Sequence, residues 1–163
     1  MAELVLLCLP TIVYLIAQSR GQDRRSGFRA ALARAGVSWG SPAGYGWALL
    51  VLLLLMLTAW LPLALIPADV QDKLGLSIAR LTSVGTAIGI TLRAVGEEVF
   101  FRGLLGGVLM RRLGFGWGNL LQATIFLVPH VPLLLIDVRL WPLLPAQFAA
   151  GWMMGWLRHK TDT

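Results

Sequence analysis

Ionisable side chains interrupt an apolar part of this sequence, and their types could perform acid–base chemistry. Arg93, Glu97, Glu98 and Arg102 fall within a stretch that is long and apolar enough to cross a membrane, and His130 lies in the next such stretch. Charged groups are costly in lipid, so their presence there needs a reason. A carboxylate can take a proton from water, and a histidine can hold a metal ion or stabilise an oxyanion. The set is therefore one that a hydrolytic site would need.

The spacing of the four charged residues predicts two ion pairs. Glu98 and Arg102 are four residues apart, so they share a helix face and can pair. Arg93 and Glu97 have the same spacing. Glu97 and Glu98 point about 100° apart on a helix, so they cannot face one partner in the same way.

Helix geometry also places Glu97 and His130 at one depth in the membrane. From Glu97 to the basic boundary at Arg111 is about 21 Å of helix, and from Trp117 to His130 is about 20 Å. The two segments are expected to be antiparallel neighbours, so the acid and the imidazole should meet within the bilayer. Prolines on both sides of His130 predict a kink that leaves room for water. On spacing alone, a hydrolytic site, a proton relay and a structural ion-pair cluster all remain open.

The composition identifies the elements that must hold these side chains. Hydrophobic residues make up 57% of the 163 residues and charged residues 13%, about half the charged content of a soluble domain. We expect an all-α fold, a polytopic membrane bundle of about five transmembrane helices at roughly 20 residues each. Within one domain, residues 1–45 should form a first span and a basic segment, and residues 46–163 the membrane core. The single cysteine, Cys8, excludes an internal disulfide and a cysteine-based metal site.

Five apolar stretches define the expected spans. They are Leu4–Ala17, Trp47–Ile66, Leu81–Met110, Trp117–Ile136 and Leu140–Leu157. Every second boundary is basic, which places the N-terminus outside and the C-terminus in the cytoplasm. The net charge of +6 is thus assigned to loops facing the cytoplasm and membrane lipid, not to nucleic-acid binding. In the basic segment, Phe28 and Leu32 are spaced as on one face of an amphipathic surface helix.

Glycines are expected to bring the helices close together and to turn the chain. Small residues recur four apart in the pairs Gly85/Gly89, Gly103/Gly107 and Gly151/Gly155, a spacing that lets helix backbones approach. The glycine-rich region 114–118 predicts the turn between the third and fourth spans. Asn119, just after it, is expected to have a structural role.

Two motifs resemble those of a known family. One is the run EEVFFR at residues 97–102, which resembles the EExxxR motif of the CPBP intramembrane proteases. These are also called the CAAX-protease and bacteriocin-processing family. The other is the run FLVPH at residues 126–130, which resembles the family's FxxxH motif. The resemblance covers about residues 85–160 and includes the glycine-containing helix at 147–158.

The resemblance implies an α-helical membrane metalloendopeptidase that cuts peptide bonds near the membrane. It makes Glu97 the general base that activates water, and His130 the residue that helps to hold a metal or the oxyanion. It pairs Glu98 with Arg102 to position the helix, and it packs Phe126 beneath the histidine. Zinc or another divalent metal is the implied cofactor, with Glu97 and His130 as ligands. A protein or peptide is the implied substrate.

The sequence departs from the family at its end. Members have a further motif on a last helix, a histidine followed four residues later by Asn or Asp, and this sequence ends at Thr163 before such a helix would begin. His159 lies between basic residues at the membrane edge and is expected to be a solvated loop residue. A catalytic zinc normally has three protein ligands, and only Glu97, Glu98 and His130 are well placed. We therefore expect either a truncated or degenerate, catalytically incomplete member of the family, or a helical partner that supplies the missing helix and completes the site.

Two functions without catalysis remain open beside the endopeptidase. One is a protease-like immunity or scaffold protein that binds a peptide or a membrane partner. The other is a small transporter or channel subunit that uses the same charges. In each case we expect a multi-pass protein of the bacterial plasma membrane.

Overall fold

The computed structural model describes residues 2–19, 32–33, 39–73 and 84–161 of the chain. The longer helices are α1 (Ala2–Ser19), α3 (Pro42–Leu65), α5 (Val84–Glu97), α6 (Gly107–Leu127) and α8 (Leu143–Thr161). The short ones are α4 (Ala68–Lys73), α7 (Leu133–Ile136), the π-helix η1 (Glu98–Gly106) and the 3₁₀ helices η2 (Val128–His130) and η3 (Val138–Leu140). No strand occurs in the described ranges. The all-α fold predicted from composition is confirmed.

Helix α3 is apolar on every side and is largely uncovered. Ser41 caps its first turn by accepting a hydrogen bond from the Gly44 N–H at 3.1 Å, and Pro42 occupies the first turn, where no N–H is needed. Over its most apolar 18 residues the mean hydropathy is 2.6, and only 11% of that stretch is buried. A soluble protein rarely exposes so large an apolar surface, so this helix is suited to lipid.

By length and composition, two helical segments of the described chain could cross a membrane, Pro42–Leu65 and Ala87–Ile136. The second segment contains a reversal at Gly114, which has φ 75° and ψ 168°. The chain then returns so closely that a Cβ built on Gly118 would lie 2.6 Å from the Cα of Met110. The expected turn is therefore present, and this segment comprises an outgoing and a returning arm.

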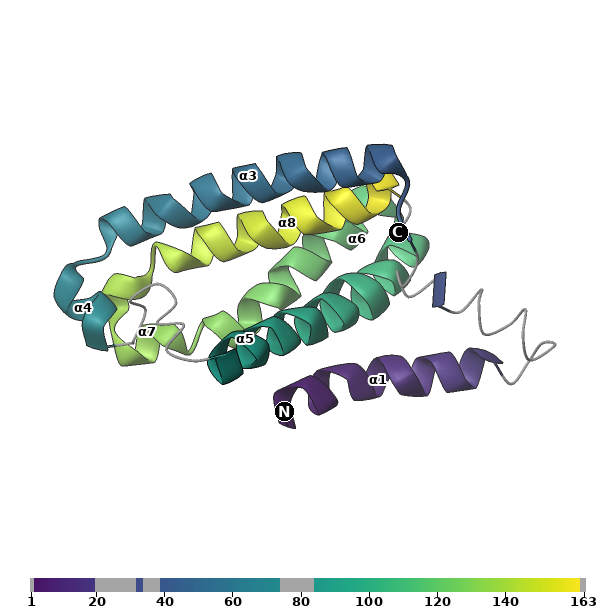
Figure 1. The fold of residues 1–163 in the computed structure, drawn as a ribbon, viewed down its shortest axis with the longest axis horizontal. Helices are drawn as coiled ribbons and strands as arrows, with labels where there is room; N and C mark the ends of the chain where they lie inside the picture. Colours follow the sequence, from purple (N-terminus) through teal and green to yellow (C-terminus); the bar gives the residue numbers. More distant parts are fainter. Residues whose placement is uncertain (1, 20–31, 34–38, 74–83, 162–163) are drawn as a thin grey trace.

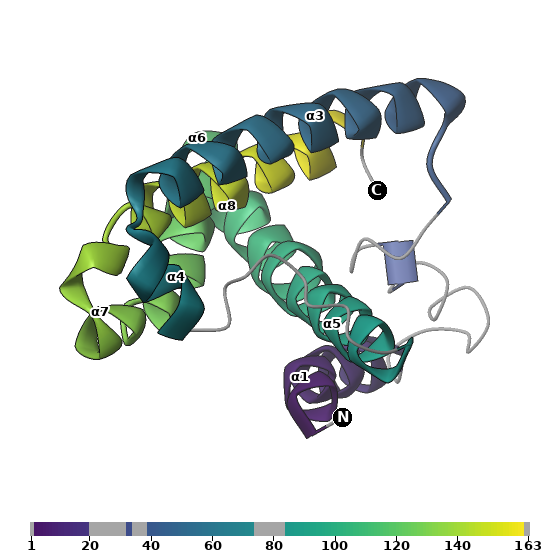
Figure 2. The same ribbon diagram turned by 60° about the vertical axis from the view of Figure 1, so that its left-hand side comes forward.

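The helices form an assembly in which α8 is central (Figure 1). α3 and α6 both pack against α8, while α1 packs against α5 and η1. Figure 2 shows α1 at the edge of the molecule, beside α5 and away from α3. Gly151 brings α8 against α6, because a Cβ there would lie 3.3 Å from the Cα of Ala123. Gly89, by contrast, has no described atom within 4 Å of such a Cβ, so the close approach expected there does not occur among the described residues.

At one end of the assembly, α4 packs against the connection that precedes α8. Ile66, Val70 and Leu140 form a buried apolar cluster there. The guanidinium of Arg139 donates to Asp69 at 3.1 Å and to Asp137 at 2.8 Å. The connections after the second and fourth expected spans thus lie at the same end, as alternating crossings require.

The opposite end holds the start of α3, the start of the returning arm and the end of α8. Trp47 packs edge-on against Trp156, with ring centroids 5.4 Å apart. Phe115 stacks on His159 with centroids 4.4 Å apart. His159 is exposed, as expected, but the expectation of a loop was wrong, because the residue lies in the last turn of α8.

Two expected spans differ from the observed helices in their interior. The expected span Leu81–Met110 is not one regular α-helix, because it changes to a π-helix at Glu98. The expected span Trp117–Ile136 is continuously α-helical only to Leu127. It continues as the 3₁₀ helix η2 and the short α-helix α7. The proline pair around His130 causes this second break, since proline cannot donate the helical hydrogen bond. Phe28 lies outside the described residues, so the amphipathic segment stays a prediction, as does the division at residue 45.

Candidate active site

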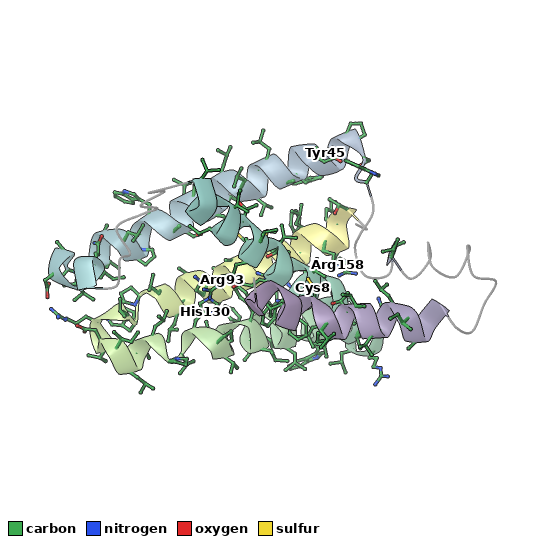
Figure 3. The ribbon with its side chains drawn as sticks, turned by 60° about the horizontal axis from the view of Figure 1, so that its bottom comes forward. Cys8, Tyr45, Arg93, His130 and Arg158 are labelled. Carbon is green, nitrogen blue, oxygen red and sulfur yellow. The ribbon has the colours of Figure 1, made fainter. Side chains whose placement is uncertain are left out.

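A pocket of about 280 Å³ lies where α1, α5, η1 and the end of the returning arm meet. Glu97 and His130 both line it, as the helix-rise estimate predicted. The other described lining residues are Leu7, Arg93, Phe101, Phe126 and Pro129. Figure 3 shows Arg93 and His130 side by side in this region. The pocket therefore joins one acid, one imidazole and one guanidinium within mostly apolar walls.

Glu97 is the last residue of α5, and the preceding turn supplies its partner. Arg93 Nε donates to Glu97 Oε1 at 3.0 Å, which confirms the predicted four-residue pair. The Glu97 side chain is 24% exposed and that of Arg93 is 60% exposed, so the arginine reaches the surface and the carboxylate is mostly enclosed. This ion pair places a guanidinium beside the Glu97 carboxylate at the wall of the pocket.

His130 is oriented by its own helix. Its Nδ1 lies 3.0 Å from the carbonyl oxygen of Phe126. A carbonyl can only accept, so Nδ1 carries the proton of this hydrogen bond and Nε2 is left as the second functional nitrogen. In the 3₁₀ geometry of η2, residue 129 would donate to this carbonyl, but Pro129 has no N–H. The imidazole Nδ1–H donates to the Phe126 carbonyl in place of the missing backbone N–H.

Phe126 is the packing centre of the site. Its ring is 5% exposed and contacts the rings of Phe101 and His130, each at a centroid distance of 5.0 Å. The guanidinium carbon of Arg102 lies 3.9 Å from the centroid of the same ring. The contact between Phe126 and the histidine is the one that the resemblance implied. The ring joins the EEVFFR run to the FLVPH run.

The two adjacent acids have different surroundings. Glu97 lines the pocket, whereas Glu98 and Arg102 are not among its described lining residues. Glu98 lies 3.5 Å from Arg102, which confirms the second predicted pair. Arg102 is buried, and its Nε and Nη1 make no hydrogen bond within the described part of the chain. Its positive charge is therefore balanced by Glu98 and by the face of Phe126.

The π-helix η1 is a feature that sequence reasoning missed. It covers Glu98–Gly106, which includes most of the EEVFFR run. Segments of π-helix are rare and often occur at functional sites. The only sequence signal was the group of glycines at Gly103, Gly106 and Gly107, and glycines are too common in membrane helices to identify a π-helix.

Three pocket residues were also missed as site residues. Phe101 could have been found, since it lies four residues after Glu97 and therefore on the same helix face. For Pro129 the sequence predicts only a role in the kink, not a place in the pocket wall. Leu7 had no signal, because nothing in the sequence indicates which helix α1 packs against.

Buried amides join α6 to α8 beside the site. Asn119 is fully buried, and its Nδ2 donates to the carbonyl of Trp152 at 3.1 Å. This bond between α6 and α8 agrees with the structural role expected of Asn119. Gln122 is fully buried too, and its Oε1 would lie 2.6 Å from a Cβ on Gly155. The absent side chain of Gly155 thus makes room for both amides.

The described residues offer fewer metal ligands than a catalytic zinc site normally has. No group of three or more His, Cys, Asp or Glu side chains that could hold a metal ion occurs there. Glu97 and His130 supply two donors at the pocket, against the three that a catalytic zinc normally takes. These residues alone do not fit a closed zinc site.

Comparison with known proteins connects this geometry to one family. No curated protein and no solved structure matches the chain. The model of the family "Type II CAAX prenyl endopeptidase Rce1-like" matches residues 78–163, which is more than half of the sequence. The matched region holds both motif runs, η1 and α8, and the match bears out the resemblance found in the motifs. The chain belongs to the Rce1-like family of type II CAAX prenyl endopeptidases.

Proposed function

We propose that this membrane protein is an intramembrane endopeptidase in which Glu97 activates water for attack on a peptide bond. The observation that carries the proposal is that Glu97 and His130, from two different arms of the chain, line one pocket with mostly apolar walls. Family membership supports a protease of the membrane, and the two long apolar segments support membrane insertion.

The proposed reaction uses the carboxylate as a proton carrier. Glu97 takes a proton from a water molecule in the pocket, and the water oxygen forms a bond to the carbonyl carbon of the substrate. The carbon–nitrogen bond then breaks, and Glu97 returns the proton to the leaving amine. General acid–base catalysis of this kind contributes typically 10²–10⁴-fold to the rate.

His130 is proposed to stabilise the negative oxygen of the intermediate. Its Nδ1 is engaged with the Phe126 carbonyl, so Nε2 is the nitrogen available to the substrate. Protonated, the imidazole donates from Nε2 to the oxyanion. Phe126 and the Glu98–Arg102 pair do not take part in proton transfer in this proposal; they hold the two motif runs together.

A divalent metal held by Glu97 and His130 remains a separate proposal, and no step above depends on it. Its test is prolonged dialysis of the full chain against a chelator, followed by addition of zinc. Loss of cleavage with recovery on zinc addition would support a metal. Full activity after dialysis would show that the acid and the imidazole act without one.

Five crossings with a cytoplasmic C-terminus also belong to the proposal. Support comes from the placement of the connections, since the Asp69–Arg139 contact lies at one end and the Phe115–His159 stack at the other. Residues 111–112 and 158–160 put basic side chains at the second end, as the positive-inside rule requires of a cytoplasmic end.

The deciding experiment uses the full chain in lipid vesicles with fluorogenic peptides tethered to the same bilayer by an acyl chain. We expect cleavage by the native chain and a loss of at least a hundredfold in Glu97→Gln. Asp69→Asn is the matched control, because it removes an equivalent charge from a residue that does not line the pocket, and it should cleave normally. Binding of the peptides without cleavage would instead favour the scaffold or immunity protein.

A further inference from the structure

Arg158 makes a contact that its place in a basic cluster does not predict. It lies in the last turn of α8, in the run Arg158-His159-Lys160 that marks a membrane boundary. Its Nη1 donates to the carbonyl oxygen of Gly103 at 2.6 Å. Gly103 belongs to η1 and directly follows the EEVFFR run. Arg158, which is labelled in Figure 3, thus connects α8 to the backbone of η1.

The Gly103 carbonyl is accessible because the helix changes type here. In a regular α-helix, the N–H of Gly107 would bond this carbonyl. At the end of η1, the Gly107 N–H bonds the Leu104 carbonyl instead. Gly103 also has no side chain that could cover its own oxygen. The transition from π- to α-helix therefore presents an acceptor, and Arg158 supplies a charged donor.

The same helix also contacts the other half of the site. A Cβ on Gly151 would lie 3.2 Å from Cδ1 of Phe126, so α8 packs directly on the ring that supports His130. Gly151 and Arg158 are seven residues apart, about two turns, and therefore lie on one face of α8. This face touches η1 through Arg158 and the FLVPH run through Gly151.

We propose that Arg158 is a positioning residue that fixes the π-helix η1 against α8, and so sets the placement of Glu97 and Phe101 relative to His130. A hydrogen bond from a charged donor is among the stronger kinds, and this one is partly buried. The catalytic part of this inference rests on the proposed endopeptidase function. The structural part does not depend on it.

The first test is amide hydrogen exchange of the full chain in lipid nanodiscs. We expect Arg158→Met to speed exchange at least tenfold in η1 and the first turn of α6, a factor that corresponds to about 1.4 kcal/mol. Lys160→Met is the matched control, because it removes the same charge two residues away, where the ammonium lies over Trp47. Unchanged exchange in Arg158→Met, or an equal change in Lys160→Met, would overturn the inference.

Arg158→Lys keeps the charge and shortens the donor, so it should speed exchange of the same amides by about threefold. If the methionine variant does not insert into membranes, the lysine variant decides the question by the same comparison, and unchanged exchange would refute the inference.

The second test is kinetic, with the tethered fluorogenic peptides. For Arg158→Met we expect kcat to fall at least tenfold with KM changed less than twofold, and Arg158→Lys to recover most of kcat. A change confined to KM would contradict a positioning role. If the native chain cleaves no peptide, the proposed function fails, while the exchange result still decides whether Arg158 fixes η1.

Discussion

Glu97 and His130 line the same pocket from the two arms of a chain that reverses at Gly114. Glu97 ends α5 on the outgoing arm, and His130 ends η2 beyond the returning arm. Their meeting follows from similar lengths of helix on each side of the turn. The catalytic proposal therefore depends on the geometry of a helical hairpin, with α8 packed along it.

Exchanging the two adjacent acids for amides should separate chemistry from structure. Glu97→Gln keeps the shape of the side chain but cannot take a proton, so we expect cleavage to fall 10²–10⁴-fold, with normal stability. Glu98→Gln removes the anion beside the buried Arg102, so we expect a loss of about 1–2 kcal/mol in stability and a smaller loss of activity. Peptide cleavage and thermal unfolding of both variants in the same vesicles measure this. Equal activity losses would count against a special role for Glu97.

Two substitutions at His130 should distinguish its two nitrogens. Asparagine can still donate to the Phe126 carbonyl, which now accepts from Nδ1 at 3.0 Å, but it offers nothing in place of Nε2. We expect the His130→Asn variant to unfold at nearly the same temperature as the native chain and to have a kcat at least a hundredfold lower. His130→Ala should lose activity and also some stability. An active asparagine variant would show that only the orienting bond matters.

Adding one methyl group should have opposite effects at two glycines. At Gly155 a Cβ would overlap Asn119 Oδ1 and come within 2.6 Å of Gln122 Oε1, both fully buried. We expect Gly155→Ala to cost about 1–3 kcal/mol, the usual cost of overpacking. At Gly89 no described atom lies within 4 Å, so Gly89→Ala should be neutral or stabilise by up to about 1 kcal/mol. Unfolding in detergent compares them, and similar destabilisation of both would disprove the packing of α8 on α6.

The turn between the arms should tolerate alanine at Gly116 but not at Gly114. Gly114 has φ 75°, a conformation that costs residues with a side chain about 1–3 kcal/mol. We expect Gly114→Ala to lower stability by about that amount. Gly116 has no described atom within 4 Å and no positive φ, so Gly116→Ala is the control and should have little effect. If the two variants unfold alike, the reversal does not depend on Gly114.

The sequence predicted the parts of the site that depend on regular helix geometry. The pairs Arg93–Glu97 and Glu98–Arg102 follow from four-residue spacing, and both are present. The common pocket of Glu97 and His130 follows from the rise per residue. The ion pairs need only the local helical repeat, and the common pocket needs in addition the short turn that makes the two arms antiparallel neighbours.

The parts that depend on tertiary contacts could not be predicted in this way. The bond from Arg158 to Gly103 joins residues that are distant in sequence, and a basic residue at a helix end is usually solvated. No residue type in the sequence specifies the change to a π-helix at Glu98. Pro129 and Pro132 allow either a kink or a helix end, so the sequence predicts an interruption here but not that α6 ends at Leu127.

Leu7 forms part of the pocket wall, although α1 touches the rest of the molecule mainly through α5 and η1. It also lies outside residues 78–163, the region that the family model matches. The acid and the imidazole therefore come from the shared region, while part of the cavity's shape comes from a helix outside it. Grafting a foreign first helix onto residues 78–163 would keep the acid and the imidazole but replace the part of the pocket wall that Leu7 supplies.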